Sequence, residues 1–284
     1  MTTVLYTGGT GRMGGVIREG LAGRYDRVVL YARSASDAPL HPNEEIVIGD
    51  LADLDRLTEA AAGVDVIVHL GGVADEASYD EIRTSNIDGT YNVYEAARRA
   101  GVRRVVYASS NHIVGFHPAS ELLDETAPLR PDTYYGVSKA FGEALASLYH
   151  DKWGIESVLL RIGTFRPAPE DRRQLGLWLS WPDGVELLRC AIESGPVGCQ
   201  VVYGCSANTD RWWNADAGWA AIGFVPQDDA ADHSDGVDFA AALPKFAAAG
   251  CGADRAASVA VPVVDGSHCS RGCDEGRLSE WWRG

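Results

Sequence analysis

The chain reads Thr7-Gly8-Gly9-Thr10-Gly11-Arg12-Met13-Gly14 directly after a short β-rich run, and a helical pattern follows. The glycines Gly8, Gly11 and Gly14 are spaced three residues apart. Glycine permits a tight turn and lets the backbone approach a pyrophosphate, which the N–H groups and dipole of the following helix can bind. A strand, a glycine turn and a helix in this order predict a dinucleotide-binding unit.

Strand and helix patterns alternate outward from this turn. Strands are expected at 3–7, 27–32, 45–49, 64–70, 103–109 and 155–161, and helices at 15–22, 53–62, 78–100 and 132–153. This alternation predicts an α/β protein with a Rossmann-type, doubly wound parallel sheet and right-handed crossovers.

The pattern changes after about residue 163. A Pro-rich and charged loop, a helix at 183–193, a short strand at 201–203 and a helix at 215–222 are expected there. This part is too small for a core of its own, so we expect residues 1–165 to bind NAD(P) and 166–232 to form a small C-terminal substrate cap. Residues 233–284 lack sustained periodicity and are expected to be a poorly ordered tail.

Tyr135 and Lys139 lie four residues apart on the expected helix 132–153, and therefore one turn apart on the same face. A free tyrosine titrates near pH ~10, and a neighbouring cation favours the phenolate. We predict that Tyr135 is a catalytic base whose pKa Lys139 lowers. Ser110, just after a strand, directs a hydroxyl to the same edge of the sheet.

The end of the second strand reads Ala32-Arg33-Ser34, where an Asp or Glu would bind the ribose hydroxyls of NAD. A guanidinium at Arg33, helped by Arg12, suits the 2′-phosphate of NADP by charge and forked geometry. An exposed arginine at a strand end, with NAD as the cofactor, is the alternative.

Composition narrows the possible functions. The net charge is −15, from 40 acidic and 25 basic residues, which disfavours binding to nucleic acid. The sequence contains neither a candidate membrane helix nor a signal-peptide pattern at its start, so a cytoplasmic protein is expected. The six cysteines are scattered, and Cys269 and Cys273 after His268 lack the usual paired zinc spacing, so no metal is expected.

Together these features resemble the extended short-chain dehydrogenase/reductases. The matching pieces, in order, are the glycine turn, Asp50-Leu51, His69-Leu70-Gly71-Gly72, the strand end at Ser110 and the Tyr135/Lys139 pair. The resemblance implies a cofactor site made of Gly8, Gly11, Arg12, Met13, Gly14, Arg33, Asp50, Leu51, Leu70, Gly71, Gly72, Asn86, Tyr135, Lys139 and Ile162.

Four further stretches are similar to the uronate dehydrogenase group of that family. They are 108–112, 135–139, 161–164 and 201–208, the last followed by Trp212-Trp213. This similarity covers roughly residues 3–232 and implies that the enzyme oxidises C1 of glucuronate or galacturonate to an aldarolactone with NAD(P). It also implies catalytic residues Ser110, Tyr135 and Lys139, and substrate contacts from Asn111, His112, Thr164 and the carboxylate-binding Arg173.

The chain departs from that group at two positions. Ala74 stands where the group has a substrate-contacting serine, and Arg33 stands where it has an acidic residue. Arg172 beside Arg173 leaves the register of the carboxylate clamp open by one residue.

Two other functions stay open from the sequence. A glucose 6-phosphate dehydrogenase of the same short-chain type would use the arginine loop for a phosphate, and Trp178-Leu179-Ser180 also fits that type. A non-catalytic nicotinamide sensor would not need the full Ser110, Tyr135 and Lys139 set. The partner is expected to be a small sugar acid, and by resemblance the chain is expected to form a homo-oligomer through the helices 78–100 and 132–153.

Overall fold

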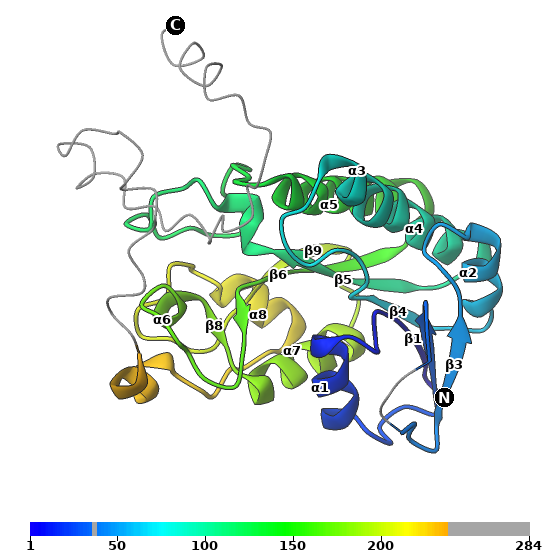
Figure 1. Cartoon of the computed structure of the whole chain (residues 1–284), viewed down its shortest axis with the longest axis horizontal. Helices are drawn as coiled ribbons and strands as arrows, with labels where there is room; N and C mark the ends of the chain where they lie inside the picture. Colours follow the sequence, from blue (N-terminus) through cyan, green and yellow to red (C-terminus); the bar gives the residue numbers. More distant parts are fainter. Residues whose placement is uncertain (36–38, 238–284) are drawn as a thin grey trace, which may run out of the picture.

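The computed structural model describes residues 1–35 and 39–237. Seven parallel strands form the main sheet in the order β3-β2-β1-β4-β5-β6-β9 (Figure 1). They are β1 (Thr3–Thr7), β2 (Arg27–Ala32), β3 (Glu44–Ile48), β4 (Val66–His69), β5 (Arg104–Ser110), β6 (Glu156–Ile162) and β9 (Cys199–Gly204). The first six strands have the order of a doubly wound dinucleotide-binding sheet, so the predicted fold class is confirmed.

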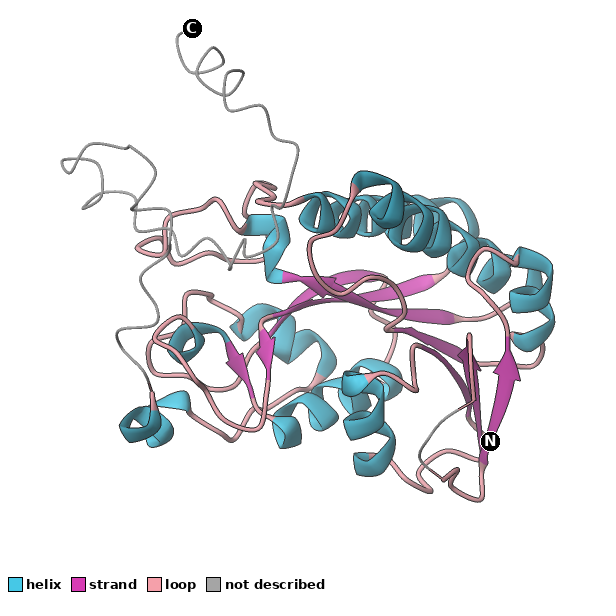
Figure 2. Ribbon diagram, in the orientation of Figure 1, coloured by secondary structure: helices cyan, strands magenta, loops and turns pink. Residues whose placement is uncertain are grey.

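Helices cover both faces of this sheet (Figure 2). On one face lie α1 (Arg12–Gly20), α7 (Trp181–Glu193) and α8 (Asp216–Ile222); on the other lie α2 (Leu54–Ala60), α4 (Gly89–Ala100) and α5 (Tyr134–Trp153). Successive strand residues point to opposite faces, as Val4 and Leu5 do when they enter the two different hydrophobic clusters. Both faces of the central strands β1, β4 and β5 are buried, which explains their continuous apolar runs.

The predicted helix 78–100 is built from three segments. α3 (Tyr79–Ile82) begins at a capping box between Ser78 and Glu81, η1 (Arg83–Asp88) is a π-helical turn, and α4 follows. A π-turn inserts an extra residue per turn and rotates the side chains that follow it. Here it turns Asn86 into the protein and brings Thr84 and Ser85 to a cleft.

The segment after β6 contributes to two sheets. β7 (Thr164–Phe165) and β8 (Trp178–Leu179) pair in a small parallel sheet, with α6 (Gln174–Leu177) between them. β9, which contains the predicted strand 201–203, instead pairs with β6 and extends the main sheet. The domain division at residues 165 and 232 stays a prediction, and most of the predicted tail, with Cys269 and Cys273, lies outside the described residues.

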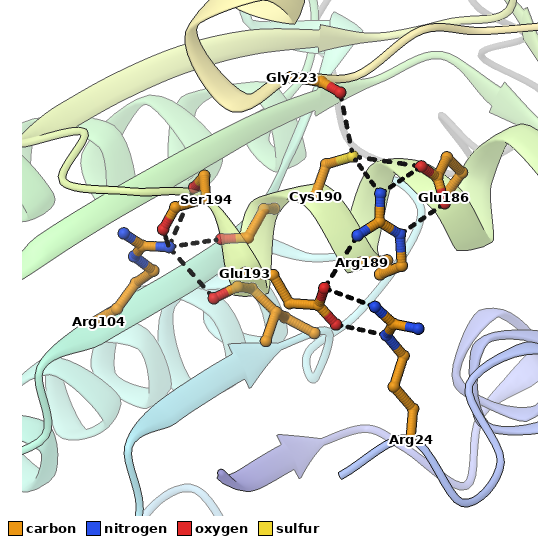
Figure 3. Close-up of polar contacts among 10 residues, drawn as sticks. Arg24, Arg104, Glu186, Arg189, Cys190, Glu193, Ser194 and Gly223 are labelled. Atoms are coloured by element: carbon orange, nitrogen blue, oxygen red, sulfur yellow. Dashed lines mark hydrogen bonds and ion pairs between the residues drawn. The ribbon is translucent and has the colours of Figure 1, made fainter. Parts of the chain in front are cut away.

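At the amino edge of the sheet, arginine side chains join α7 to β5 and to the α1–β2 turn (Figure 3). Arg104, fully buried at the start of β5, donates to Glu156 at 2.7 Å and to the backbone oxygens of Ala191, Ile192, Ser194 and Gly195 at 2.6–3.2 Å. Ala191 and Ile192 lie in the last turn of α7, where carbonyls have no partner within the helix, and Ser194 and Gly195 follow it directly. A buried guanidinium therefore completes the C-terminus of α7.

A second ion-pair chain on the same edge holds the outer face of α7. Arg24, in the turn before β2, donates two hydrogen bonds to Glu193, at 2.5 and 2.8 Å. Arg189 also binds Glu193, at 2.9 Å, and binds Glu186 one turn earlier (Figure 3).

Among the described residues, no helix is long and apolar enough to cross a membrane.

Candidate active site

A cleft of about 900 Å³ runs along the carboxyl edge of the main sheet. Its walls are the glycine turn after β1, the loops that follow β2, β3, β4, β5 and β6, and the first turns of α5. Ligands of open parallel sheets bind at this edge, because the strand ends and helix N-termini meet there. We therefore place the candidate active site in this cleft.

The glycine turn at one end of the cleft has the shape of a pyrophosphate cradle. Gly8 has φ of 71°, and a Cβ atom added to it would lie 2.8 Å from the backbone nitrogen of Gly71. No described side chain caps the N-terminus of α1, so its first N–H groups face the turn without a side-chain acceptor. These features fit a dinucleotide, and Gly11, Arg12, Met13 and Gly14 line the same wall.

The other predicted cofactor residues, with one exception, line this part of the cleft. Arg33, Asp50, Leu51, Leu70, Gly71, Gly72 and Ile162 all do so. Asn86 is the exception. Its buried amide binds the backbone N–H and oxygen of Val73, at 2.8 and 3.0 Å, and the Ser138 hydroxyl at 3.2 Å. Asn86 therefore holds the loop after β4 against α5 and is not part of the cleft wall, so its direct contact with the cofactor stays a prediction.

The N-terminus of α5 presents the predicted base to the cleft. Thr133 caps the helix by accepting from the N–H of Gly136 at 2.9 Å, and a Cβ on Gly136 would lie 2.5 Å from the His112 oxygen. Only glycine permits this close approach between α5 and the turn after β5. The carboxylate of Glu76 accepts from the N–H groups of Tyr134 and Tyr135, at 3.1 and 2.9 Å.

Ser110, Tyr135 and Lys139 meet in the cleft as predicted. The Lys139 ammonium is buried, donates to the Ala108 oxygen at 2.8 Å and lies 5.4 Å from the centre of the Tyr135 ring. The predicted lowering of the Tyr135 pKa is not found in the structure. Burial raises the pKa of Tyr135 to about 12, the Asp75 carboxylate also raises it, and a hydrogen bond with Ser110 opposes them.

Burial acts on Lys139 in the opposite sense, because its charged form is the cation. It lowers the pKa of Lys139 to about 8. Below that pH the ammonium is charged and stands beside the phenol. The pair thus keeps the predicted arrangement, but burial of the phenol is the largest influence on its pKa.

The predicted substrate residues also line the cleft. His112, in the 3₁₀ turn η2 (Asn111–Val114), places its ring edge-on to Tyr135 at 5.4 Å and binds the buried Asp132 carboxylate through Nδ1 at 2.8 Å. Asn111 precedes it, and Thr164 lies on β7. Arg173 lines the cleft and Arg172 does not, which favours Arg173 as the predicted carboxylate-binding residue.

Several wall residues were not singled out by sequence reasoning. They are Asp75, Thr84, Ser85, Phe165, Arg166 and Trp181, and behind the wall Asp132 and Glu76 orient His112 and α5. Asp75 and Glu76 follow the glycines after β4, so their position was a usable signal. Asp132 could be found only from the fold, because 20 residues separate it from His112.

Residues 4–174 match the NAD dependent epimerase/dehydratase family, and the chain belongs to that family, as its sheet order and glycine turn also indicate. Within it the chain is similar to uronate dehydrogenases. It is 45% identical to the uronate dehydrogenase of Pseudomonas syringae pv. tomato over 74% of this chain and 77% of that protein.

A solved structure gives the same relationship. A mutant of the Agrobacterium tumefaciens uronate dehydrogenase, in complex with NAD, is 43% identical with a TM-score of 0.79, over 83% of this chain and 88% of that one. A more distant relative is the NAD-dependent glucose-6-phosphate dehydrogenase of Haloferax volcanii, 36% identical over 81% of this chain and 94% of that protein.

Proposed function

We propose that this chain is an NAD-dependent dehydrogenase that oxidises C1 of a hexuronate, glucuronate or galacturonate, to an aldarolactone. The observation that carries the proposal is a single cleft that joins a dinucleotide cradle, the Ser110, Tyr135 and Lys139 set, and Arg173. The similarity to uronate dehydrogenases over most of the chain supports the same substrate class.

The reaction needs a base for the C1 hydroxyl proton, a hydride acceptor and a site for the C6 carboxylate. Tyr135 takes the hydroxyl proton, and Ser110 donates a hydrogen bond to the oxygen that becomes the lactone carbonyl. Bound NAD would supply the hydride acceptor and a positive charge beside the phenol. Lys139, fixed by the Ala108 oxygen, stabilises the phenolate and holds the nicotinamide ribose.

Arg173 and the η2 turn hold the rest of the sugar. The Arg173 guanidinium binds the C6 carboxylate, for which its forked geometry suits a bidentate pair. Asp132 fixes the His112 ring through Nδ1, so Nε2 is presented to a sugar hydroxyl. Asn111 and Thr164 provide further polar contacts to the hydroxyls.

We propose that the enzyme accepts NADP as well as NAD. Arg33 follows β2 and lines the cleft with Arg12, at the place where NAD-binding sheets present an acidic side chain. Two guanidinium groups there would favour a 2′-phosphate and tolerate its absence. NAD and NADP should therefore both support turnover.

A homo-oligomer is the proposed assembly. α4 and α5 expose Tyr91, Val137, Leu148 and Trp153, each 45–47% accessible, on the sheet face that they cover. Large apolar side chains gathered on neighbouring helices favour a protein contact. Sedimentation at several concentrations should give more than one chain per particle, and a monomer throughout would contradict the assembly.

A panel of glucuronate, galacturonate and glucose 6-phosphate, each with NAD and NADP, tests the function. Both uronates should produce absorbance of the reduced nicotinamide, with glucose 6-phosphate far weaker. Turnover of the phosphate alone would favour the second candidate, which the Haloferax relative and the additional cleft arginine Arg166 support. No turnover of any sugar would favour a nicotinamide sensor.

A further inference from the structure

The loop after β4 is fastened to α5 at both of its ends. At Val73 both backbone polar groups bind the amide of Asn86, which in turn binds Ser138 on α5. At Glu76 the carboxylate binds the N–H groups of Tyr134 and Tyr135 at the start of the same helix. The two residues between these anchors, Ala74 and Asp75, are therefore held at the cleft wall next to Tyr135.

Asp75 is the polar side chain that this loop presents to the cleft. It lines the wall together with Ser110, His112 and Tyr135, and the neighbouring Ala74 offers only a methyl group. In the part of the chain that the structure describes, no hydrogen bond or ion pair engages the Asp75 carboxylate. Its negative charge nevertheless reaches the phenol, because it raises the pKa of Tyr135.

The part of the cleft proposed to bind the sugar therefore has a negative charge at one end and positive charges at the other. Asp75 is the anion beside Tyr135, whereas Arg173 and Arg166 line the wall formed by the loop after β6. Arg166 is paired with Glu170 at 2.8 Å, and Arg173 is the proposed carboxylate partner. A hexuronate has the same polarity, since its charge is at C6 and its hydroxyls surround C1.

We propose that Asp75 determines substrate orientation and specificity: its carboxylate accepts a hydrogen bond from a hydroxyl next to C1 and excludes an anionic group from the reacting end. This inference rests on the proposed uronate oxidation and adds a residue to it. A carboxylate acceptor is stronger than a neutral one and repels a second anion, so it selects sugars with one charge at the far end.

Asp75→Asn, which keeps the size and removes the charge, tests this inference with Asp80→Asn as the matched control. Asp80 lies on α3 with an 88% accessible side chain and is not part of the cleft wall. In Asp75→Asn, the KM for galacturonate should rise about tenfold, as expected when a hydrogen bond to a charged group is weakened. Galactarate, with carboxylates at both ends, should inhibit the variant more strongly than the wild-type enzyme.

A higher KM for galacturonate together with stronger inhibition by galactarate distinguishes charge selection by Asp75 from general damage to the site. A general loss of structure would weaken both ligands together, and equal affinities in variant and wild type would overturn the inference. Asp80→Asn should leave both values unchanged. If the wild-type chain oxidises no uronate, the proposed function fails, and equilibrium binding of galacturonate and galactarate to the two proteins then decides the role of Asp75 by the same criterion.

The pH profile gives a second readout. The charged or titratable groups around the Tyr135 phenol are Asp75 from the loop after β4, Tyr107 from β5, His112 from η2 and Lys139 from α5. Removing the Asp75 anion should lower the pKa of Tyr135. Activity that increases as the phenol ionises should then begin at a lower pH in Asp75→Asn, and an unchanged profile would contradict the placement of its carboxylate beside the phenol.

Discussion

The two edges of the main sheet use the same charged side chains in different ways. At the amino edge, Arg104 and Arg24 are bonded to carboxylates and helix-end carbonyls (Figure 3). At the carboxyl edge, Arg12, Arg33 and Lys139 line a cleft, and among the described residues only the lysine of these three has a backbone partner that fixes it there.

This difference indicates which edge stabilises the fold and which edge binds ligands. A guanidinium whose donors all have protein acceptors holds α7 and β5 together and has little capacity for a ligand. Charges that face a cleft at strand ends can bind substrate and cofactor instead. Substitutions at the two edges should therefore separate stability from activity.

Among the substitutions at the carboxyl edge, Tyr135→Phe should reduce kcat the most. It removes the phenol that takes the C1 proton, so kcat should fall about a thousandfold, which corresponds to about 4 kcal/mol. The free energy of unfolding in urea should stay within about 0.5 kcal/mol of the wild-type value. Substantial turnover in this variant would remove Tyr135 as the base.

At the amino edge, Arg104→Met should reduce the stability of the fold and not its activity. It leaves Glu156 and the α7 carbonyls without their donor, so the free energy of unfolding should fall by about 3 kcal/mol. Turnover per folded molecule should be unchanged. Arg27→Met is the control, because its ion pair with Glu45 is exposed and should contribute less than about 1 kcal/mol.

Arg173→Met should affect substrate binding at the carboxyl edge. Loss of a charge-assisted pair should raise the KM for uronates about thirtyfold, or about 2 kcal/mol, while NAD binding stays the same. The neighbouring Arg172→Met, outside the cleft wall, should leave the KM unchanged. The reverse result would shift the clamp by one residue.

Arg33→Ser should have the smallest effect, confined to cofactor choice. The KM for NADP should rise about tenfold, and the KM for NAD should change less than twofold. Equal changes for the two cofactors would mean that Arg33 does not bind the 2′-phosphate. Titration with each cofactor by intrinsic tryptophan fluorescence measures the same preference at equilibrium.

The sequence was sufficient for the features that local patterns determine. Apolar strands, the glycine turn after β1 and the i, i+4 spacing of Tyr135 and Lys139 each predict their place in the fold. The sequence predicts the strand 201–203 but not its place at the edge of the main sheet, because a strand pattern does not say which sheet it joins. Its pairing with β6 is a tertiary contact 42 residues away.

The substrate side was less predictable, because its geometry depends on contacts between distant segments. Asp132 acts through His112, and Asn86 faces inward because a π-turn rotates it, which periodicity does not reveal. The rise of the Tyr135 pKa likewise follows from burial. Spacing identified the neighbouring cation, but the solvent exclusion around the phenol comes from the packed fold.

The most direct test of the account uses galacturonate labelled with deuterium at C1. After turnover with NAD, mass spectrometry of the reduced nicotinamide should show one deuterium, and the sugar product should be the aldarolactone. Unlabelled reduced nicotinamide, or label retained in an oxidised sugar, would show that the hydride leaves another carbon. Either of those results would contradict oxidation at C1.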